Sequence, residues 1–359
     1  MAPETLREMT YDEALARMPE DHGVPGFWAG DAVTVARCLD AVRRGRVSPA
    51  THSAGGRPLC VVTYGAPEAT LRHANFNSAV GARAPEAFLD HNQRTRPVVA
   101  FIGPVHGHET EGVTGLVNLV TVMETGSDLR GRPQPELRSL GDRCRLVILP
   151  VGNPDGLARF EPRLLNGMGL DDVRFWGQGT WDDDVLCGWP ECKALHPMRG
   201  DRVGFLGCYF NDDGINPMHD EFFAPMSSEV VGILDLVRGE RPDLVVLLHS
   251  HQHPPSLLRS AYVPLEVQEA VAALAARTYA HLDDLGLRHG GVFYPTAERG
   301  PFPAAFNLTS AVYHTSGAPA FTFECPHGIT GEDAYAVTPE QILDIQLTLY
   351  RSILEQVLA

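Results

Sequence analysis

The sequence has no run of about 20 apolar residues, the length that a helix needs to cross a lipid bilayer. Residues 1–8 also lack the basic start and apolar run of a secretory signal. We therefore expect a cytoplasmic protein with no membrane partner.

Basic residues are also scarce, because 29 Lys and Arg stand against 45 Asp and Glu and leave a formal charge of −16. Binding to nucleic acid requires clustered cations against the phosphates, so this balance argues against such a partner. The seven cysteines are odd in number and scattered, which suits a reducing compartment better than a disulfide framework. The chain contains no internal repeat and no low-complexity tract.

The chain does contain enough apolar material for a large core, since 44% of its 359 residues are hydrophobic. Four runs are almost continuously apolar, which is typical of strands covered on both faces: 98–102, 146–149, 244–248 and 320–323. Helical patterns lie between them at 112–124, 227–237 and 264–282, and Thr338 with Gln341 forms a capping box for a last helix. Strands that alternate with helices predict an α/β fold with a mixed or mainly parallel sheet.

At 359 residues the chain is long for one domain but shows no clear division into two. We expect residues 1–30 to form an N-terminal lead-in and residues 31–359 to form a single domain. Residues 164–210 break the pattern, because this segment has no clear periodicity and holds three of the four tryptophans. A long irregular insert is usually functional or mobile, so we expect this one at the rim of a site.

Histidine and glutamate side chains follow the first apolar run at a short spacing. His106 and Glu109 stand three residues apart, where a turn from strand to helix can aim both side chains at one point. Zinc takes neutral imidazole and carboxylate ligands in a tetrahedral set with one open position. His108 and Glu111 repeat the same spacing, so these residues alone leave open which pair binds the metal.

A third ligand and a general base can come from two other strand ends. His249 directly follows the third apolar run and is the best candidate for the ligand, ahead of His251 and His253. Glu324 ends the fourth run, where a carboxylate is costly unless it is paired or used. Its natural role is that of a general base, which takes a proton from water and returns it to a leaving nitrogen.

Four motifs thus follow one another along the chain: His106-Gly-x-Glu109-x-x-Gly112, the Asn-Pro-Asp-Gly turn at 153–156, His249-Ser250, and Phe321-Thr-Phe-Glu324. In this order they resemble the zinc carboxypeptidases of the M14 (carboxypeptidase A-like) family, over roughly residues 50–358. The resemblance implies a three-layer α/β/α sandwich and one Zn²⁺ per chain. It places the ligands on His106, Glu109 and His249, and the general base on Glu324.

The resemblance further implies an arginine that polarises the scissile carbonyl, downstream of the Asn-Pro-Asp-Gly turn. Arg163, ten residues past Asn153, matches this spacing, and Arg159 is the alternative. A fixed cation at this place would stabilise the developing oxyanion.

Family members also bind the terminal carboxylate of the substrate through an Asn-Arg pair, within a sequence like Gly-x-Asp-x-Asn-Arg. Asn216 takes the asparagine position here, but Pro217 stands where the arginine is expected. Proline has neither a donor nor a charge, so it cannot hold a carboxylate. Another arginine could substitute, and the sequence leaves open which of Arg199, Arg202, Arg259 and Arg299 does so. A mobile tyrosine above the site is expected at Tyr313 or Tyr294.

The expected function is zinc-dependent hydrolysis of an amide bond by a carboxypeptidase-like metallopeptidase. The departure at Pro217 leaves an alternative open, in which an amidase or deacylase acts on a small acylated compound. A non-catalytic binding protein on the same fold would predict a damaged ligand set or a replaced Glu324, and all four residues are present. The expected substrate is therefore a peptide or a small acyl-amide, and the oligomeric state stays open.

Overall fold

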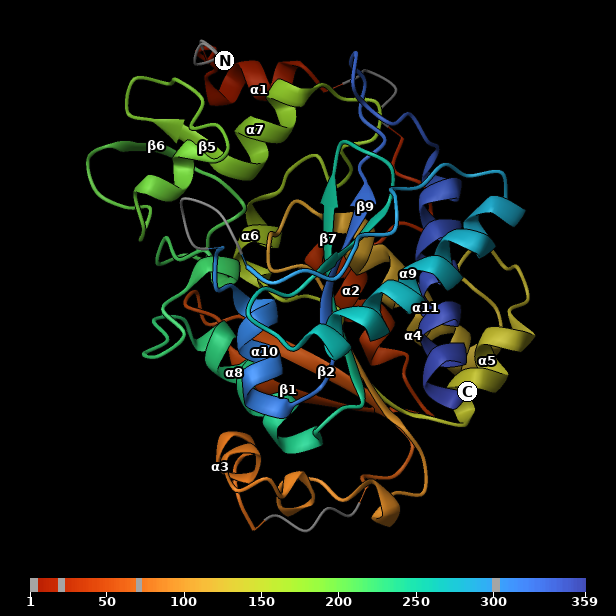
Figure 1. Ribbon diagram of the computed structural model, residues 1–359. Helices are drawn as coiled ribbons and strands as arrows, with labels where there is room; N and C mark the ends of the chain where they lie inside the picture. Colours follow the sequence, from red (N-terminus) through yellow and green to blue (C-terminus); the bar gives the residue numbers. More distant parts are fainter. Residues whose placement is uncertain (1–5, 19–22, 69–72, 299–303) are drawn as a thin grey trace.

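The computed structural model describes residues 6–18, 23–68, 73–298 and 304–359. Within these residues, a central sheet of seven strands has the order β1-β2-β4-β3-β7-β9-β8 (Figure 1). The strands β4, β3, β7 and β9 run parallel, while β1, β2 and β8 pair in antiparallel fashion. The predicted α/β fold with a mixed sheet is therefore confirmed. The strand bounds are Arg46–His52 (β1), Pro58–Tyr64 (β2), Val98–Ile102 (β3), Arg145–Leu149 (β4), Leu244–His251 (β7), Ser256–Arg259 (β8) and Ala320–Pro326 (β9).

Helices cover both faces of this sheet and complete three layers. Val246 and Leu248 of β7 pack into one apolar cluster, and Val245 and Leu247 pack into another, because strand side chains alternate between faces. The first face carries α4 (Thr110–Thr125), α5 (Pro135–Asp142), α9 (Leu265–Asp284) and α11 (Pro339–Leu358), and the second carries α8 (Ser228–Glu240) and α10 (Leu308–Ser316). In the described ranges no helix combines the length and the apolar character that crossing a membrane requires.

The observed elements agree with the predicted ones in the core and differ at their ends. The strand predicted at 98–102 has the predicted bounds, and Thr338 and Gln341 form the predicted capping box of α11. Helix α2 spans Ala32–Asp40. Strand β7 runs three residues past its predicted end, so His249 lies inside a strand and not just beyond one.

The segment 164–210, expected to be irregular, contains short regular elements. It holds α7 (Leu170–Gln178), the 3-10 helix η3 (Glu191–Ala194) and a two-stranded sheet of β5 (Gly179–Trp181) and β6 (Val203–Leu206). These elements are too short to show periodicity in a sequence. Figure 1 shows α1 (Tyr11–Ala16) beside α7, and Met9 shares an apolar cluster with Trp176. The division into a lead-in and a single domain stays a prediction.

The remaining elements are short. They are α3 (Phe76–Gly81), α6 (Pro154–Arg159), and the 3-10 helices η1 (Pro85–Ala87), η2 (His91–Gln93) and η4 (Pro217–His219).

Candidate active site

Strands β7 and β9 bring two predicted site residues side by side. His249 of β7 is paired in register with Glu324 of β9. Four residues earlier on each strand, Val245 on β7 and Ala320 on β9 belong to the apolar cluster on the face that α8 and α10 cover. Because strand side chains alternate, His249 and Glu324 both point to the same side of the sheet, at the carboxyl end where α/β proteins build their sites.

The turn between β3 and α4 carries the other two predicted ligands, His106 and Glu109. Glu109 is the N-cap residue of α4, but its side chain makes no capping hydrogen bond. It faces two imidazoles, with Nδ1 of His106 at 2.8 Å from Oε1 and Nδ1 of His249 at 3.1 Å from Oε2. The turn packs closely against Gly156. A Cβ on Gly107 would lie only 2.0 Å from the backbone carbonyl carbon of Gly156, so this position requires glycine.

The donor groups of His106, Glu109 and His249 fit a zinc ion. One ligand atom from each residue lies within 4.8 Å of the other two, and all three side chains are buried. Two imidazoles and one carboxylate form a set that catalytic zinc sites use, with the fourth position left open.

Electrostatics keeps two of these groups in the form that binds a metal. Burial raises the pKa of Glu109, but His106 and His249 bring this pKa well below its usual value, so the carboxylate stays ionised. Burial lowers the pKa of His106, so its imidazole is neutral near pH 7. Burial also opposes the charge on His249, but Glu109 offsets this and raises the pKa of His249. Metal binding needs the neutral imidazole of His249, so the ion competes with this proton and its affinity falls at low pH.

The second His-x-x-Glu pair lies outside this group. Glu111 faces His327, whose Nδ1 lies 3.1 Å from Oε1 of the carboxylate. His108 stacks at an angle against Tyr209, with ring centroids 5.1 Å apart. The geometry therefore favours His106 and Glu109, the pair that the family resemblance implies.

Glu324 lines the same cleft as the three candidate ligands. The cleft has a volume of about 560 Å³, and its walls include His106, Glu109, His249 and Glu324. Burial, opposed in part by His249, raises the pKa of Glu324 to about 7. A carboxylate with a pKa near the working pH is poised to accept and return a proton.

Asn216 was predicted to bind substrate, but it is not among the residues that line the cleft. It contacts the imidazole of His106 instead. Its Oδ1 lies 3.2 Å from Nε2 of His106 and accepts the backbone N–H of Met218 at 2.9 Å. With the proton of the imidazole on Nε2, the lone pair of Nδ1 points toward Glu109. Partners of this kind fix the tautomer and orientation of ligand histidines.

We expect Asn216→Leu to weaken zinc binding by about 10- to 100-fold, because His106 loses the acceptor that orients it. A competition titration against a chromophoric chelator measures this affinity. Asn216→Asp keeps an acceptor at the same place and is the matched control, with affinity close to that of the wild type. Equal affinities of the Leu variant and the wild type would rule out the orienting role.

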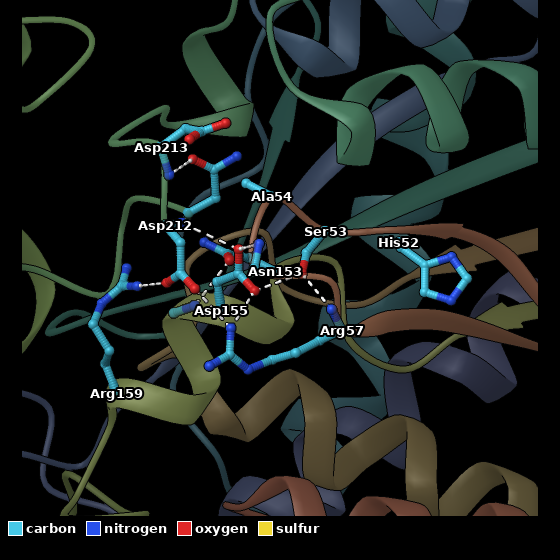
Figure 2. Close-up of polar contacts among 12 residues, drawn as sticks. His52, Ser53, Ala54, Arg57, Asn153, Asp155, Arg159, Asp212 and Asp213 are labelled. Carbon is cyan, nitrogen blue, oxygen red and sulfur yellow. Dashed lines mark hydrogen bonds and ion pairs between the residues drawn. The ribbon is translucent and has the colours of Figure 1, made fainter.

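The two predicted arginines do not reach the cleft. The guanidinium of Arg163 pairs with Asp31, with Nη2 at 2.5 Å from Oδ2, and 44% of its side chain is exposed. Figure 2 shows Arg159 directed at Asp212, with which it forms an ion pair. The spacing along the chain fixes how far each arginine lies from the turn, but acidic partners elsewhere decide where its side chain points. The geometry gives no support to an oxyanion role for either.

The aromatic ring beside the ligands is also not the predicted one. Tyr313 packs edge to face on Phe76, with ring centroids 5.6 Å apart, and Tyr294 is 88% exposed. Tyr209 instead stacks on His106, with ring centroids 3.9 Å apart and an angle of 20° between the planes. Tyr209 lines the cleft and Tyr313 does not.

Two cations of the cleft were not expected from the sequence. Arg174 of α7 and Lys193 of η3 both line it. The sequence carries a signal for each. Gly169-Leu-Asp171-Asp-Val-Arg174 matches the pattern Gly-x-Asp-x-Asn-Arg except for its asparagine, and Lys193 is the only lysine of the chain.

A family model described as zinc carboxypeptidase matches residues 40–199, which include His106 and Glu109 but end before His249 and Glu324. No curated protein matches the sequence significantly.

Solved carboxypeptidases share the fold at low sequence identity. A metallo-carboxypeptidase from Burkholderia cenocepacia has a TM-score of 0.53 at 16% identity, over 90% of this chain and 68% of that chain. Carboxypeptidase A from Helicoverpa armigera has a TM-score of 0.51 at 14% identity, over 97% of this chain and 72% of that one. Bovine thrombin-activatable fibrinolysis inhibitor, solved in complex with tick carboxypeptidase inhibitor, has a TM-score of 0.53 at 12% identity. The match covers 91% of this chain and 95% of that chain. The family match over residues 40–199 confirms the resemblance predicted from the motifs, and the solved structures share the fold.

Proposed function

We propose that this chain is a zinc-dependent metallopeptidase of the carboxypeptidase type, which holds one Zn²⁺ per chain and hydrolyses an amide bond. The observation that carries the proposal is the convergence of His106, Glu109 and His249 in the cleft that Glu324 also lines. The family match and the carboxypeptidase fold support the same class of reaction.

The roles of the residues follow from their chemistry. His106, Glu109 and His249 would hold the ion, and zinc, when bound, supplies the Lewis acidity that makes water nucleophilic and polarises the scissile carbonyl. Glu324 takes a proton from the attacking water and returns it to the leaving nitrogen. Its pKa of about 7 suits both transfers near neutral pH.

One observation favours a second candidate, an amidase or deacylase that acts on a small acylated compound. Pro217 begins η4 and is buried, so the position expected to hold an arginine offers neither a donor nor a charge. In the described residues, the hydrogen-bond partners of Asn216 are His106, His196, Met218 and His219, and none of them is an arginine. Arg299 lies outside the described residues.

Matched peptides separate the two candidates. One peptide has a free C-terminal carboxylate and the other is amidated, and both are offered to the zinc-loaded protein and to Glu324→Gln. Cleavage of the free acid alone, lost in the variant, is the result expected of a carboxypeptidase. Cleavage of neither peptide, with one zinc per chain confirmed by metal analysis, would contradict the peptidase proposal and favour the amidase, to be tested on N-acylated amino acids.

A further inference from the structure

The insert places one compact cation beside the candidate metal ligands. Lys193 is the only lysine among the 359 residues. It lies in η3, is partly buried, and lines the cleft that contains His249 and Glu324. Its Nζ lies 4.8 Å from the ring centroid of Trp189, another cleft residue, so a cation–π contact holds the ammonium in the cleft wall.

Lys193 differs from the other cations of the cleft in having no carboxylate partner within the described ranges. Arg174 pairs with Asp171 at 3.2 Å, and Arg259 pairs with Glu298 at 2.5 Å. Burial lowers the pKa of Lys193 below its usual value, and the neighbouring Cys192 opposes this shift only in part. A partly buried ammonium is costly without a counter-ion, and in a chain of charge −16 the absence of one is unexpected.

The charge of Lys193 is felt inside the site. Burial lowers the pKa of His219 to about 3, and the ammonium of Lys193 adds to this effect. An anion bound at Lys193 would lie in the cleft that His106, Glu109 and His249 also line.

We propose that Lys193 is the anion-binding residue of this cleft, and that the substrate carries a carboxylate that binds Lys193 while its amide bond lies at Glu324. The inference rests on the proposed function and narrows its substrates to acylated amino acids and peptides with a free acid. The carboxylate-binding residue would then lie in the insert and not at Pro217, where the family resemblance places it. Lysine binds a carboxylate as a point charge, so it accepts orientations that the planar fork of an arginine does not.

Kinetics on a matched free acid and amide test the inference. Lys193→Met should lower kcat/KM for the free acid by about 10- to 100-fold, mainly through KM, because a charged hydrogen bond is lost. The rate on the amide should not change, and Lys193→Arg should restore part of the preference for the acid. Arg174→Gln is the matched control. An unchanged acid-to-amide ratio in Lys193→Met, or its loss in Arg174→Gln alone, would overturn the inference.

A labelling experiment tests the anion site without relying on hydrolysis. Because the chain has a single lysine, acetic anhydride acetylates at amines only Lys193 and the α-amino group, and mass spectrometry resolves the two. N-acetylphenylalanine should slow acetylation of Lys193 in the zinc-loaded protein, while N-acetylphenylalaninamide should not. Protection by the acid in a protein that hydrolyses neither peptide would retain the anion site and reject the proposed peptidase. No protection, or equal protection by acid and amide, would overturn the anion site.

Discussion

Glu324→Gln is expected to lower kcat by about 10²- to 10⁴-fold while zinc still binds. Glutamine keeps the size of the side chain and one of its hydrogen-bonding oxygens, but it cannot accept a proton at neutral pH. Glu324 is not one of the three converging ligand residues, so its loss leaves them in place. The measurement is kcat on a cleaved substrate, together with the zinc content of the purified variant.

The control for this prediction is Glu332→Gln, an exposed carboxylate eight residues further along the chain, which should keep the full rate. A Glu324→Gln protein that keeps both its zinc and its rate would show that another group moves the proton. In that case His327, which also lines the cleft, is the next side chain to replace.

The core of the fold was predictable because its strands are buried on both faces. Continuous apolar runs of five residues, such as 98–102 and 244–248, fit a buried strand and are short for a helix. A capping box marks the start of α11. The edge strands were less predictable. β1 contains Pro49 at an irregularity in its register, and its burial pattern shows no fully buried residue. Such strands are defined by their neighbours more than by their own sequence.

The candidate site shows the same division between local and distant information. His106 and Glu109 lie three residues apart in one turn, and His249 and Glu324 lie on adjacent strands, so motifs at strand ends predict that they meet. Several other residues of the cleft come from the insert, and the way an insert folds back onto a cleft depends on packing between distant segments. Tyr209 and Lys193 were therefore not found from the sequence.

The arginines illustrate a further limit. Arg163 has a left-handed backbone, with φ of 64°, and its guanidinium pairs with Asp31, more than 100 residues earlier in the chain. A spacing counted from a motif contains no information about such a partner.

Asp155→Asn is expected to lower the free energy of unfolding by about 2–4 kcal/mol. Asp155 is fully buried, and Figure 2 shows it at the centre of a polar network. Its Oδ1 accepts from the hydroxyl of Ser53 and from Arg57, and its Oδ2 accepts the backbone N–H groups of Gly55 and Asp212. An asparagine turns one of these acceptors into a donor and leaves Arg57 with less negative charge to balance it.

Urea denaturation of the variant and the wild type measures this loss, and Asp212→Asn is the matched control. The carboxylate of Asp212 also pairs with Arg57, but 37% of its side chain is exposed, so its replacement should cost less than about 1 kcal/mol. Equal losses in the two variants would show that the burial of Asp155 adds nothing.

The dependence on pH separates the charge of Asp155 from its shape. Burial raises the pKa of Asp155, but its hydrogen bonds and Arg57 bring the pKa below its usual value. The ionised form therefore stabilises the fold above about pH 4, where the unfolded carboxyl is also ionised, and this stabilisation is lost as the pH falls through the lower pKa of the folded state. The difference in unfolding free energy between wild type and Asp155→Asn should shrink over that range.

Because the network holds the segment from Asp212 toward Asn216, the variant should also bind zinc more weakly through the lost support of His106.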